Sequence, residues 1–281
     1  MAENIYEKTF NSTKPDQLVQ FTGIVVTYND AQRLRECLNS LKFCEQLLVI
    51  DLGSVDESVE IACECGAEVV NHKWVPIVEQ VWPYAVSLAR HSWIIRADPD
   101  EICPTSLADD LRKIIAKSEF VGVIETPHQY YFCGKPLTTT VWGNIKYIGK
   151  VFHRDRVRIE PCVHRGIRCR NGYSSQRIKR TEDNVVQHYW VDTFAQLLEK
   201  HKRYIKAEGK SRYDSGQRFS WLKMIVSVCR ELKANLINYR GLFGGFNGVF
   251  LSFFYGWYIF ESWLSLRKYE RCQINNRERL F

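Results

Sequence analysis

The chain has 281 residues, of which 45% are hydrophobic and 25% charged, and its formal net charge is +7. This length and balance argue against a disordered chain and fit one large globular domain, or one domain with an appendage. The positive charge admits a nucleic acid, an anionic ligand or a membrane surface as partner, and by itself it does not choose among them.

We expect no secretory signal, because residues 1–8 contain acidic side chains and no apolar core. The ten cysteines are scattered and form no Cys-x-x-Cys motif, which argues against a zinc site or a thioredoxin-type site. Scattered thiols without a signal suit a reducing cytosol, so the sequence predicts a cytoplasmic protein.

Alternating β-type runs, polar turns and helical patterns follow an unpatterned lead-in over residues 1–20. The β-type runs are Phe21–Thr27, Gln46–Ile50 and residues 66–70, and the helical patterns cover residues 34–41 and 57–65. Asn29 or Asp30 is expected to cap the first of these helices. Repeated βα units predict an α/β fold with a mostly parallel sheet flanked by helices.

A further apolar run, Trp93–Ala97, leads directly into the carboxylates Asp98, Asp100 and Glu101. Two acids one residue apart, with a stiff proline between them, suit Mg²⁺ or Mn²⁺, because these ions prefer oxygen ligands and bridge substrate phosphates. The alternative is a solvated acidic turn that caps a helix beginning near Thr105.

Three polar turns follow strands of the predicted sheet: Thr27 to Asn29, Asp51 to Asp56 and Asp98 to Glu101. In an open α/β sheet, ligands bind at the carboxyl ends of the strands. Because the topology brings the three turns together, they are better evidence for a ligand site than any one of them alone.

These turns resemble the motifs of the family 2 inverting glycosyltransferases, whose nucleotide-sugar-binding domain is of the GT-A type. The residues that carry the resemblance are Thr27-Tyr28-Asn29, Asp51-x-Gly53-Ser54-x-Asp56, Asp98-Pro99-Asp100-Glu101, Gly134-Lys135, Val163-His164 and His188-Tyr189. The likeness covers about residues 21–270 and is closest to the lipopolysaccharide-core glucosyltransferase branch. It implies a mixed, mostly parallel sheet with a helical, aromatic C-terminal extension.

The resemblance also implies a role for single positions. The nucleotide-sugar would be contacted by Thr27, Tyr28, Asn29, Asp51, Gly53, Ser54, Asp56 and Asp98, and the divalent ion would be held by Asp98, Asp100 and His188. Structural alternatives stay open: Asp56 caps a helix, Gly53 only supplies a positive φ, and Glu101 is a helix-dipole partner or an active-site acid. His188 has a packed or hydrogen-bonded role as its alternative.

The general base is the least determined part of the predicted site. An inverting transfer needs a base to take the proton of the acceptor hydroxyl. The related branch carries Val-His-Glu where this chain has Arg165 in place of the acid. The candidates for the base are therefore Asp183, Glu182, His164 and Glu160, and loss of activity through Arg165 is the other outcome.

Residues 120–160 predict a strand over 120–125 and carry aromatic and basic side chains. Tyr130, Tyr131, Trp142 and Tyr147 are candidates to stack on a sugar, with core packing as the alternative. Basic residues also gather in this region and indicate a solvated face, with contact to an anionic acceptor or a phosphate as the alternative: Lys146, Lys150, Arg154, Arg156 and Arg158.

The C-terminal part is predicted to be helical over residues 194–210 and 221–236, and again over 249–264 after a glycine-rich break. Gly244 stands in that break where the family usually has an acid. The last helix is too short to span a membrane and is rich in aromatic residues, so we expect it to lie against the inner face of the cell membrane. A buried helix or a homodimer contact is the alternative.

Three segments are thus predicted: a lead-in over residues 1–20, an α/β domain over 21–192 with a donor half (21–103) and an acceptor half (104–192), and a helical extension over 193–281. The predicted activity is inverting, Mn²⁺- or Mg²⁺-dependent transfer of a sugar from a UDP-sugar to a hydroxyl of a surface glycan or glycolipid. A non-catalytic nucleotide-sugar-binding or membrane scaffold is the alternative. No nucleic-acid recognition motif is present.

Overall fold

The computed structural model describes residues 18–75, 77–159 and 167–278. The strands are β1 (Phe21–Thr27), β2 (Gln46–Asp51), β3 (Glu68–Asn71), β4 (Trp93–Ala97), β5 (Glu101–Ile102), β6 (Val121–Phe132), β7 (Lys135–Pro136), β8 (Lys146–His153), β9 (Val157–Ile159), β10 (Ile167–Cys169), β11 (Ser174–Arg177) and β12 (Val186–Val191). The α-helices are α1 (Ala31–Ser40), α2 (Ser58–Glu64), α3 (Trp82–Ser87), α4 (Leu107–Lys117), α5 (Phe194–Asp214), α6 (Trp221–Lys233) and α7 (Gly245–Glu278).

Within the described residues, ten strands form one sheet in the order β3-β2-β1-β4-β8-β6-β12-β5, with β7 and β11 paired to β6. Strands β1 to β4 pair in parallel, as do β6 and β12, whereas β8 runs antiparallel between β4 and β6. All seven residues of β1 are buried, as its β-branched run predicts for a central strand covered on both faces. The sheet is therefore mixed and mostly parallel, as predicted.

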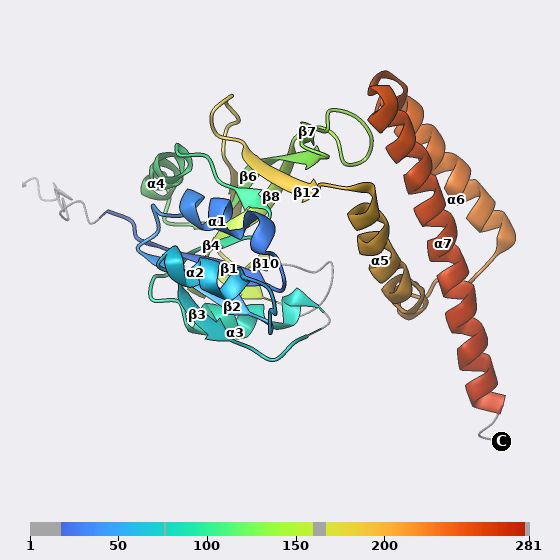
Figure 1. Ribbon diagram of the computed structural model, residues 1–281, viewed down its shortest axis with the longest axis horizontal. Helices are drawn as coiled ribbons and strands as arrows, with labels where there is room; N and C mark the ends of the chain where they lie inside the picture. Colours follow the sequence, from blue (N-terminus) through green and yellow to red (C-terminus); the bar gives the residue numbers. More distant parts are fainter. Residues whose placement is uncertain (1–17, 76, 160–166, 279–281) are drawn as a thin grey trace, which may run out of the picture.

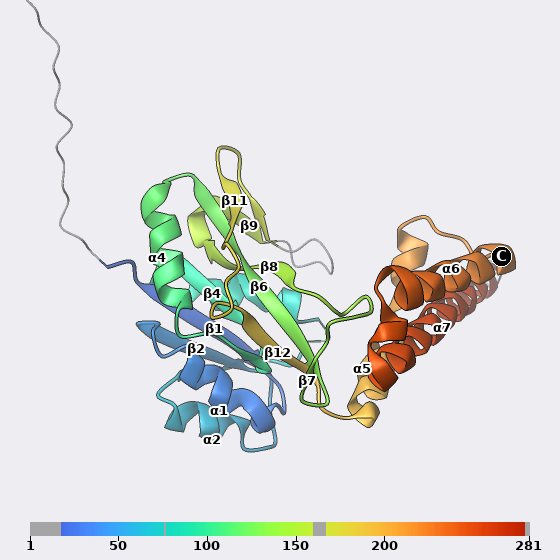
Figure 2. The same ribbon diagram turned by 90° about the horizontal axis from the view of Figure 1, so that it is seen from above.

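Helices cover both faces of the sheet (Figures 1 and 2). On one face, Leu34 of α1 and Leu111 of α4 join a buried cluster that contains Val25. On the other face, Trp82 of α3 packs with Ile24. Because successive side chains of a strand point to opposite faces, β1 contributes to both clusters.

The helices α1 and α2 begin side by side and share one carboxylate. Asp30 stands at the N-cap position of α1 but forms no side-chain cap, and its carboxylate accepts a hydrogen bond from Tyr28 N (3.0 Å) instead. The predicted local cap is therefore wrong. Asp56 accepts from Ala31 N at the start of α1 and from Ser58 N at the start of α2, each at 3.0 Å. One side chain thus satisfies free N–H groups of two helices, which confirms the capping alternative for Asp56.

Three long helices, α5 to α7, follow the sheet and pack beside it (Figure 1). Helix α5 starts at a capping box formed by Thr193 and Gln196. Leu197 of α5 and Leu251 of α7 join Phe132 of β6 in a buried cluster that attaches the helices to the sheet. No helix in the described ranges has an apolar stretch long enough to cross a membrane.

Helix α7 is longer than predicted, since it covers 34 residues from Gly245 to Glu278. Its middle part packs on α5, where Gly209 allows a close approach: a Cβ at this position would lie 2.5 Å from the carbonyl oxygen of Ser265. The sequence pattern ended the predicted helix with the aromatic stretch, at residue 264. The observed helix extends further because it packs tightly on α5 and α6.

Candidate active site

The turns after β1 and β2 are joined by hydrogen bonds. Asn29 adopts a left-handed conformation with φ of 57°. Its backbone N–H donates to Ser54 Oγ at 2.9 Å, and its Oδ1 accepts from Val55 N at 2.8 Å. Thr27 lies buried at the end of β1, and Tyr28 is exposed beside it. Four predicted donor-site residues therefore lie together, as the topology requires.

Asp51 is part of the structure of its own turn. Its carboxylate accepts hydrogen bonds from the backbone N–H groups of Gly53 and Ser54, both at 3.1 Å, and the side chain is buried. Gly53 has a φ of 89°, which confirms that it supplies the positive φ of the turn. Only the remaining lone pairs of Asp51 are free to accept from a ligand.

Strand β4 brings the acidic stretch to the same edge of the sheet. The side chains of Asp98 and Asp100 are 45% and 30% exposed, whereas that of Glu101 is only 1% exposed. Glu101 is buried because it begins β5, which pairs with β12 opposite His188. Since α4 begins only at Leu107, Glu101 is not a partner of the α4 dipole, and that alternative is wrong.

The charge that balances these acids is Lys150 of β8. Its ammonium donates to Asp98 Oδ2 at 2.7 Å and to Glu101 Oε2 at 2.9 Å, and the side chain is buried. A solvated face does not describe this lysine, because β8 lies inside the sheet between β4 and β6. Burial alone would raise the pKa of Glu101, but Lys150 and two histidines hold this pKa well below its usual value.

His188 of β12 faces two of the acids. Its Nε2 lies 3.4 Å from Asp100 Oδ1, and its Nδ1 lies 3.2 Å from Glu101 Oε1. Tyr130 stacks on the imidazole with ring centroids 4.5 Å apart, so this tyrosine packs on a histidine. Burial by itself would lower the pKa of His188, but the carboxylates of Asp100 and Glu101 raise it to about 9. Without a bound cation the imidazole is therefore protonated at neutral pH, and a metal ion at Nε2 would displace that proton.

His128 of β6 completes the inner part of the cluster. Its Nε2 is 2.8 Å from Thr126 Oγ1, and its Nδ1 lies 3.4 Å from Glu101 Oε1. Burial lowers the pKa of His128. Among the described residues, the buried atoms His128 Nδ1, His188 Nδ1 and Glu101 Oε1 form no hydrogen bond of good geometry.

Two overlapping sets of side chains have the composition and spacing of metal ligands. One consists of Asp98, Asp100 and His188, the other of Glu101, His128 and His188, and the ligand atoms of each set lie within 4.8 Å of one another. The second set is sealed in the interior beside the Lys150 ammonium, which opposes a second cation there. Only the first set opens to the edge where a substrate phosphate can share the ion.

Lys200 lies in α5, within the helix predicted over residues 194–210, and is a site residue that the sequence did not mark as one. Its ammonium donates to the carbonyl oxygen of Trp190 at 3.2 Å. Burial lowers the pKa of Lys200, whereas the carboxylates of Asp100 and Asp98 act in the opposite direction. Helix α5 therefore brings a cation to the acidic edge, and no local pattern in the sequence marks this position.

The base candidates differ in where they lie. Glu160 and His164, together with Arg165, are outside the described residues. Glu182 and Asp183 are exposed on the segment before β12, where Ser106 Oγ donates to the Asp183 carbonyl oxygen at 3.0 Å. In the ranges that the structure describes, neither carboxylate forms a hydrogen bond or an ion pair with Asp98, Asp100 or His188, so their role as base stays a prediction.

A mixed, mostly parallel sheet with helices on both faces and an acidic edge is the architecture of an α/β domain of the GT-A type. Residues 22–225 match the family described as Glycosyl transferase family 2, and the chain belongs to this family. An uncharacterized glycosyltransferase of Rickettsia typhi is 23% identical over 278 residues, which cover 92% of this chain and 89% of that protein.

A higher identity is confined to shorter segments. An uncharacterized glycosyltransferase of Rickettsia felis is 33% identical over 98 residues, so the matched segment spans about a third of that relative (34%) and of this chain (34%).

Among solved structures, S. aureus TarS in complex with UDP is 18% identical over 41% of this chain and 36% of that chain, with a TM-score of 0.34. Glucosyl-3-phosphoglycerate synthase from Mycobacterium tuberculosis, with Mn²⁺ and UDP-glucose, is 15% identical over 42% and 45%, with a TM-score of 0.35.

Proposed function

We propose that this protein is an inverting, divalent-cation-dependent glycosyltransferase that uses a nucleotide-sugar, specifically a UDP-sugar, as donor. The observation that carries the proposal is the set of Asp98, Asp100 and His188 at the open edge of the sheet. Carboxylate oxygens and one imidazole suit Mn²⁺ or Mg²⁺. When bound, such an ion would neutralise the charge of the leaving diphosphate.

Different side chains would then contact the nucleoside, the diphosphate and the acceptor hydroxyl. Thr27, Asn29 and Ser54, joined across two turns, would contact the nucleoside, with Tyr28 and Asp51 beside them. Lys200 adds a positive charge at the acidic edge, where the diphosphate would lie. Asp183 or Glu182, or Glu160 or His164 outside the described residues, would take the proton of the acceptor hydroxyl.

The acceptor and the location follow from the family resemblance and from the helical extension. We propose a hydroxyl of a surface glycan or glycolipid, such as a lipopolysaccharide core, as the acceptor. The enzyme would work in the cytoplasm on the inner face of the cell membrane, with residues 193–281 as the membrane-facing segment and residues 21–192 as the catalytic domain.

Glu101 is buried behind the proposed cation site, and its removal is expected to lower the affinity for Mn²⁺. Glu101 lies 3.2 Å from His188 Nδ1 and would fix the imidazole so that Nε2 faces the cation. We expect Glu101→Gln to weaken Mn²⁺ binding by about 10- to 100-fold, as loss of an outer-shell partner does. Titration calorimetry of Mn²⁺ measures this, with Glu125→Gln as control, because Glu125 lies on β6 and pairs with Arg177 instead. An equal loss of Mn²⁺ affinity in Glu101→Gln and Glu125→Gln would exclude a role of Glu101 in positioning His188.

The proposed function is tested by calorimetric titration of UDP, GDP and UDP-glucose into the wild-type protein, once with Mn²⁺ and once with EDTA. We expect UDP and UDP-glucose to bind only with Mn²⁺, and GDP to bind more weakly. Donor turnover with a glycolipid extract then tests transfer. If no nucleotide binds under either condition, the transferase proposal fails, whereas binding without turnover leaves the non-catalytic alternative.

A further inference from the structure

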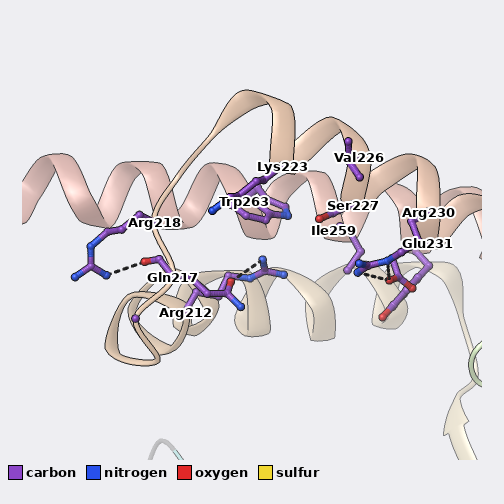
Figure 3. A pocket seen from close by; sticks show the side chains of 12 residues that line it. Arg212, Gln217, Arg218, Lys223, Val226, Ser227, Arg230, Glu231, Ile259 and Trp263 are labelled. Carbon is purple, nitrogen blue, oxygen red and sulfur yellow. Dashed lines mark hydrogen bonds and ion pairs between the residues drawn. The ribbon is translucent and has the colours of Figure 1, made fainter.

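A basic hollow lies between α5, α6 and α7, in the helical extension (Figure 3). Its volume is about 780 Å³. The cations on its lining are Arg212, Arg218, Lys223 and Arg230, and Glu231 is the acid among them. Trp263 of α7 forms part of the wall, so the hollow joins positive charge to an aromatic surface.

The cations of the hollow are only partly neutralised. Arg230 pairs with Glu231 at 2.9 Å, and Arg212 pairs with Glu208 at 3.1 Å. The Arg218 guanidinium instead lies over the ring of Tyr213, 4.1 Å from its centroid. Lys223 forms no ion pair with any residue that the structure describes. The hollow therefore has positive charge available for an anion.

The outer surface beside the hollow is apolar. On α6, Leu222, Ile225, Val226 and Cys229 recur at helical spacing and are exposed, Leu222 to 72%. Val226 also lines the hollow, so the apolar stripe and the cations adjoin. At the turn between α6 and α7, Phe243 is 82% exposed. Exposed apolar patches of this kind mark interaction sites.

The charge of this segment selects among possible partners. Between Arg218 and Cys272 the sequence has eight Lys and Arg residues against three Glu residues. A second copy of this chain would bring the same cationic stripe against itself, because a twofold interface pairs identical surfaces. A nucleic acid would leave the apolar stripe of α6 in water. An anionic membrane suits both the apolar stripe and the cations, since the acyl region accepts apolar side chains and the anionic headgroups attract cations.

We infer that α6 lies in the interface of an anionic membrane and that the hollow between α5, α6 and α7 binds the phosphate of an anionic phospholipid headgroup. The inference rests on the proposed membrane location and names the contact surface and the lipid class. Leu222 and Ile225 enter the acyl boundary. Lys223, Arg218 and Arg230 lie at headgroup level, where long basic side chains reach the phosphates.

The experiment is co-sedimentation of the full chain with vesicles of phosphatidylcholine, with or without about a third of phosphatidylglycerol. We expect binding only to the anionic vesicles. The double variant Lys223→Glu with Arg230→Glu is expected to lose at least about 30-fold in vesicle affinity, because each basic residue near an anionic surface contributes about fivefold. The variant Leu222→Ser with Ile225→Ser is expected to lose a similar amount.

The matched control is Lys113→Glu with Lys117→Glu, the same change of charge on two exposed positions of α4. We expect it to keep vesicle binding within a fewfold of wild type. Glycerol phosphate, a free headgroup analogue, is expected to compete with vesicles only weakly, because it lacks the acyl chains that Leu222 and Ile225 would contact. An equal loss of vesicle binding in the α4 control overturns the inference, and so does unchanged vesicle binding in both α6 variants. A dimer seen by light scattering that dissociates only in the variant Leu222→Ser with Ile225→Ser also overturns it.

Calorimetric UDP binding is measured on every variant. Intact UDP binding with lost vesicle binding is the expected result for both α6 variants and separates the membrane surface from the donor site. If wild-type protein binds UDP but no vesicles, the inference fails and the transferase proposal stands. If it binds vesicles but no nucleotide, the transferase proposal fails and the lipid site stands.

Discussion

Asp100→Asn is expected to abolish Mn²⁺-dependent UDP binding and to reduce sugar transfer by about a thousandfold. Asp100 offers the more enclosed of the two open carboxylates, with its Oδ1 3.4 Å from His188 Nε2. Asparagine keeps the shape but removes the charge, so it loses several kcal/mol of cation-mediated stabilisation of the leaving group. Calorimetry with UDP and Mn²⁺, followed by a transfer assay, measures both effects.

The control for this prediction is Asp109→Asn, the same chemical change on an exposed acid of α4. It is expected to bind UDP as wild type does. Because Asp100 also lies 3.4 Å from His188 Nε2 and can pair with it when no cation is bound, thermal unfolding of both variants is compared first. A folded Asp100→Asn protein that still binds UDP in a Mn²⁺-dependent manner contradicts the assignment of the cation site.

Lys150→Met is expected to lower the free energy of unfolding by about 3–5 kcal/mol. The methionine matches the length of the lysine stem but leaves Glu101 and Asp98 without the ammonium that lies 2.9 Å and 2.7 Å from them. The strongly unfavourable contribution is a buried carboxylate that has lost its closest cation, since only His128 and His188 then remain beside Glu101. Urea unfolding at neutral pH, followed by circular dichroism, measures the change.

Two further variants isolate the charge effect. Lys135→Met on the exposed strand β7 is expected to change stability by less than about 0.5 kcal/mol. Adding Glu101→Gln to Lys150→Met removes one of the uncompensated charges, so the double variant is expected to be more stable than Lys150→Met alone. If the second substitution destabilises further by its full separate effect, the two groups are not coupled and the interpretation of the cluster is wrong.

Much of the α/β architecture was predictable, because its signals are local. The β-branched run of β1, the turn at Gly53 and the acids after β4 each depend on residues within one element and the turn beside it. The parallel pairing of β1 with β2 then follows from the short βα connection between them, whereas β4 joins the other side of β1 only after β3 and α3. The antiparallel insertion of β8 was not predictable, since its partners β4 and β6 are chosen by the packed sheet rather than by adjacency in the chain.

In the candidate site, too, some residues could be predicted from local sequence and others could not. The acids Asp98 and Asp100 and the histidine His188 were recognisable from motif and resemblance, whereas the role of Glu101 stayed open between two alternatives. For Lys150, the expected solvated face was wrong, because a lysine among basic residues has the sequence pattern of a solvated face whether or not it is buried. Its burial follows from strand pairing across the sheet.

The strands and helices of the N-terminal half, and the polar turns that end those strands, can be read from the amino-acid sequence, since hydrophobic period and turn chemistry act over a few residues. The pairing of Lys150 with carboxylates 52 and 49 residues away and the position of Lys200 near the acidic edge depend on the folded chain. So does the length of α7, which packs on Gly209 at Ser265 and continues to Glu278. Charge compensation and close packing depend on which surfaces meet, and no local pattern encodes that pairing.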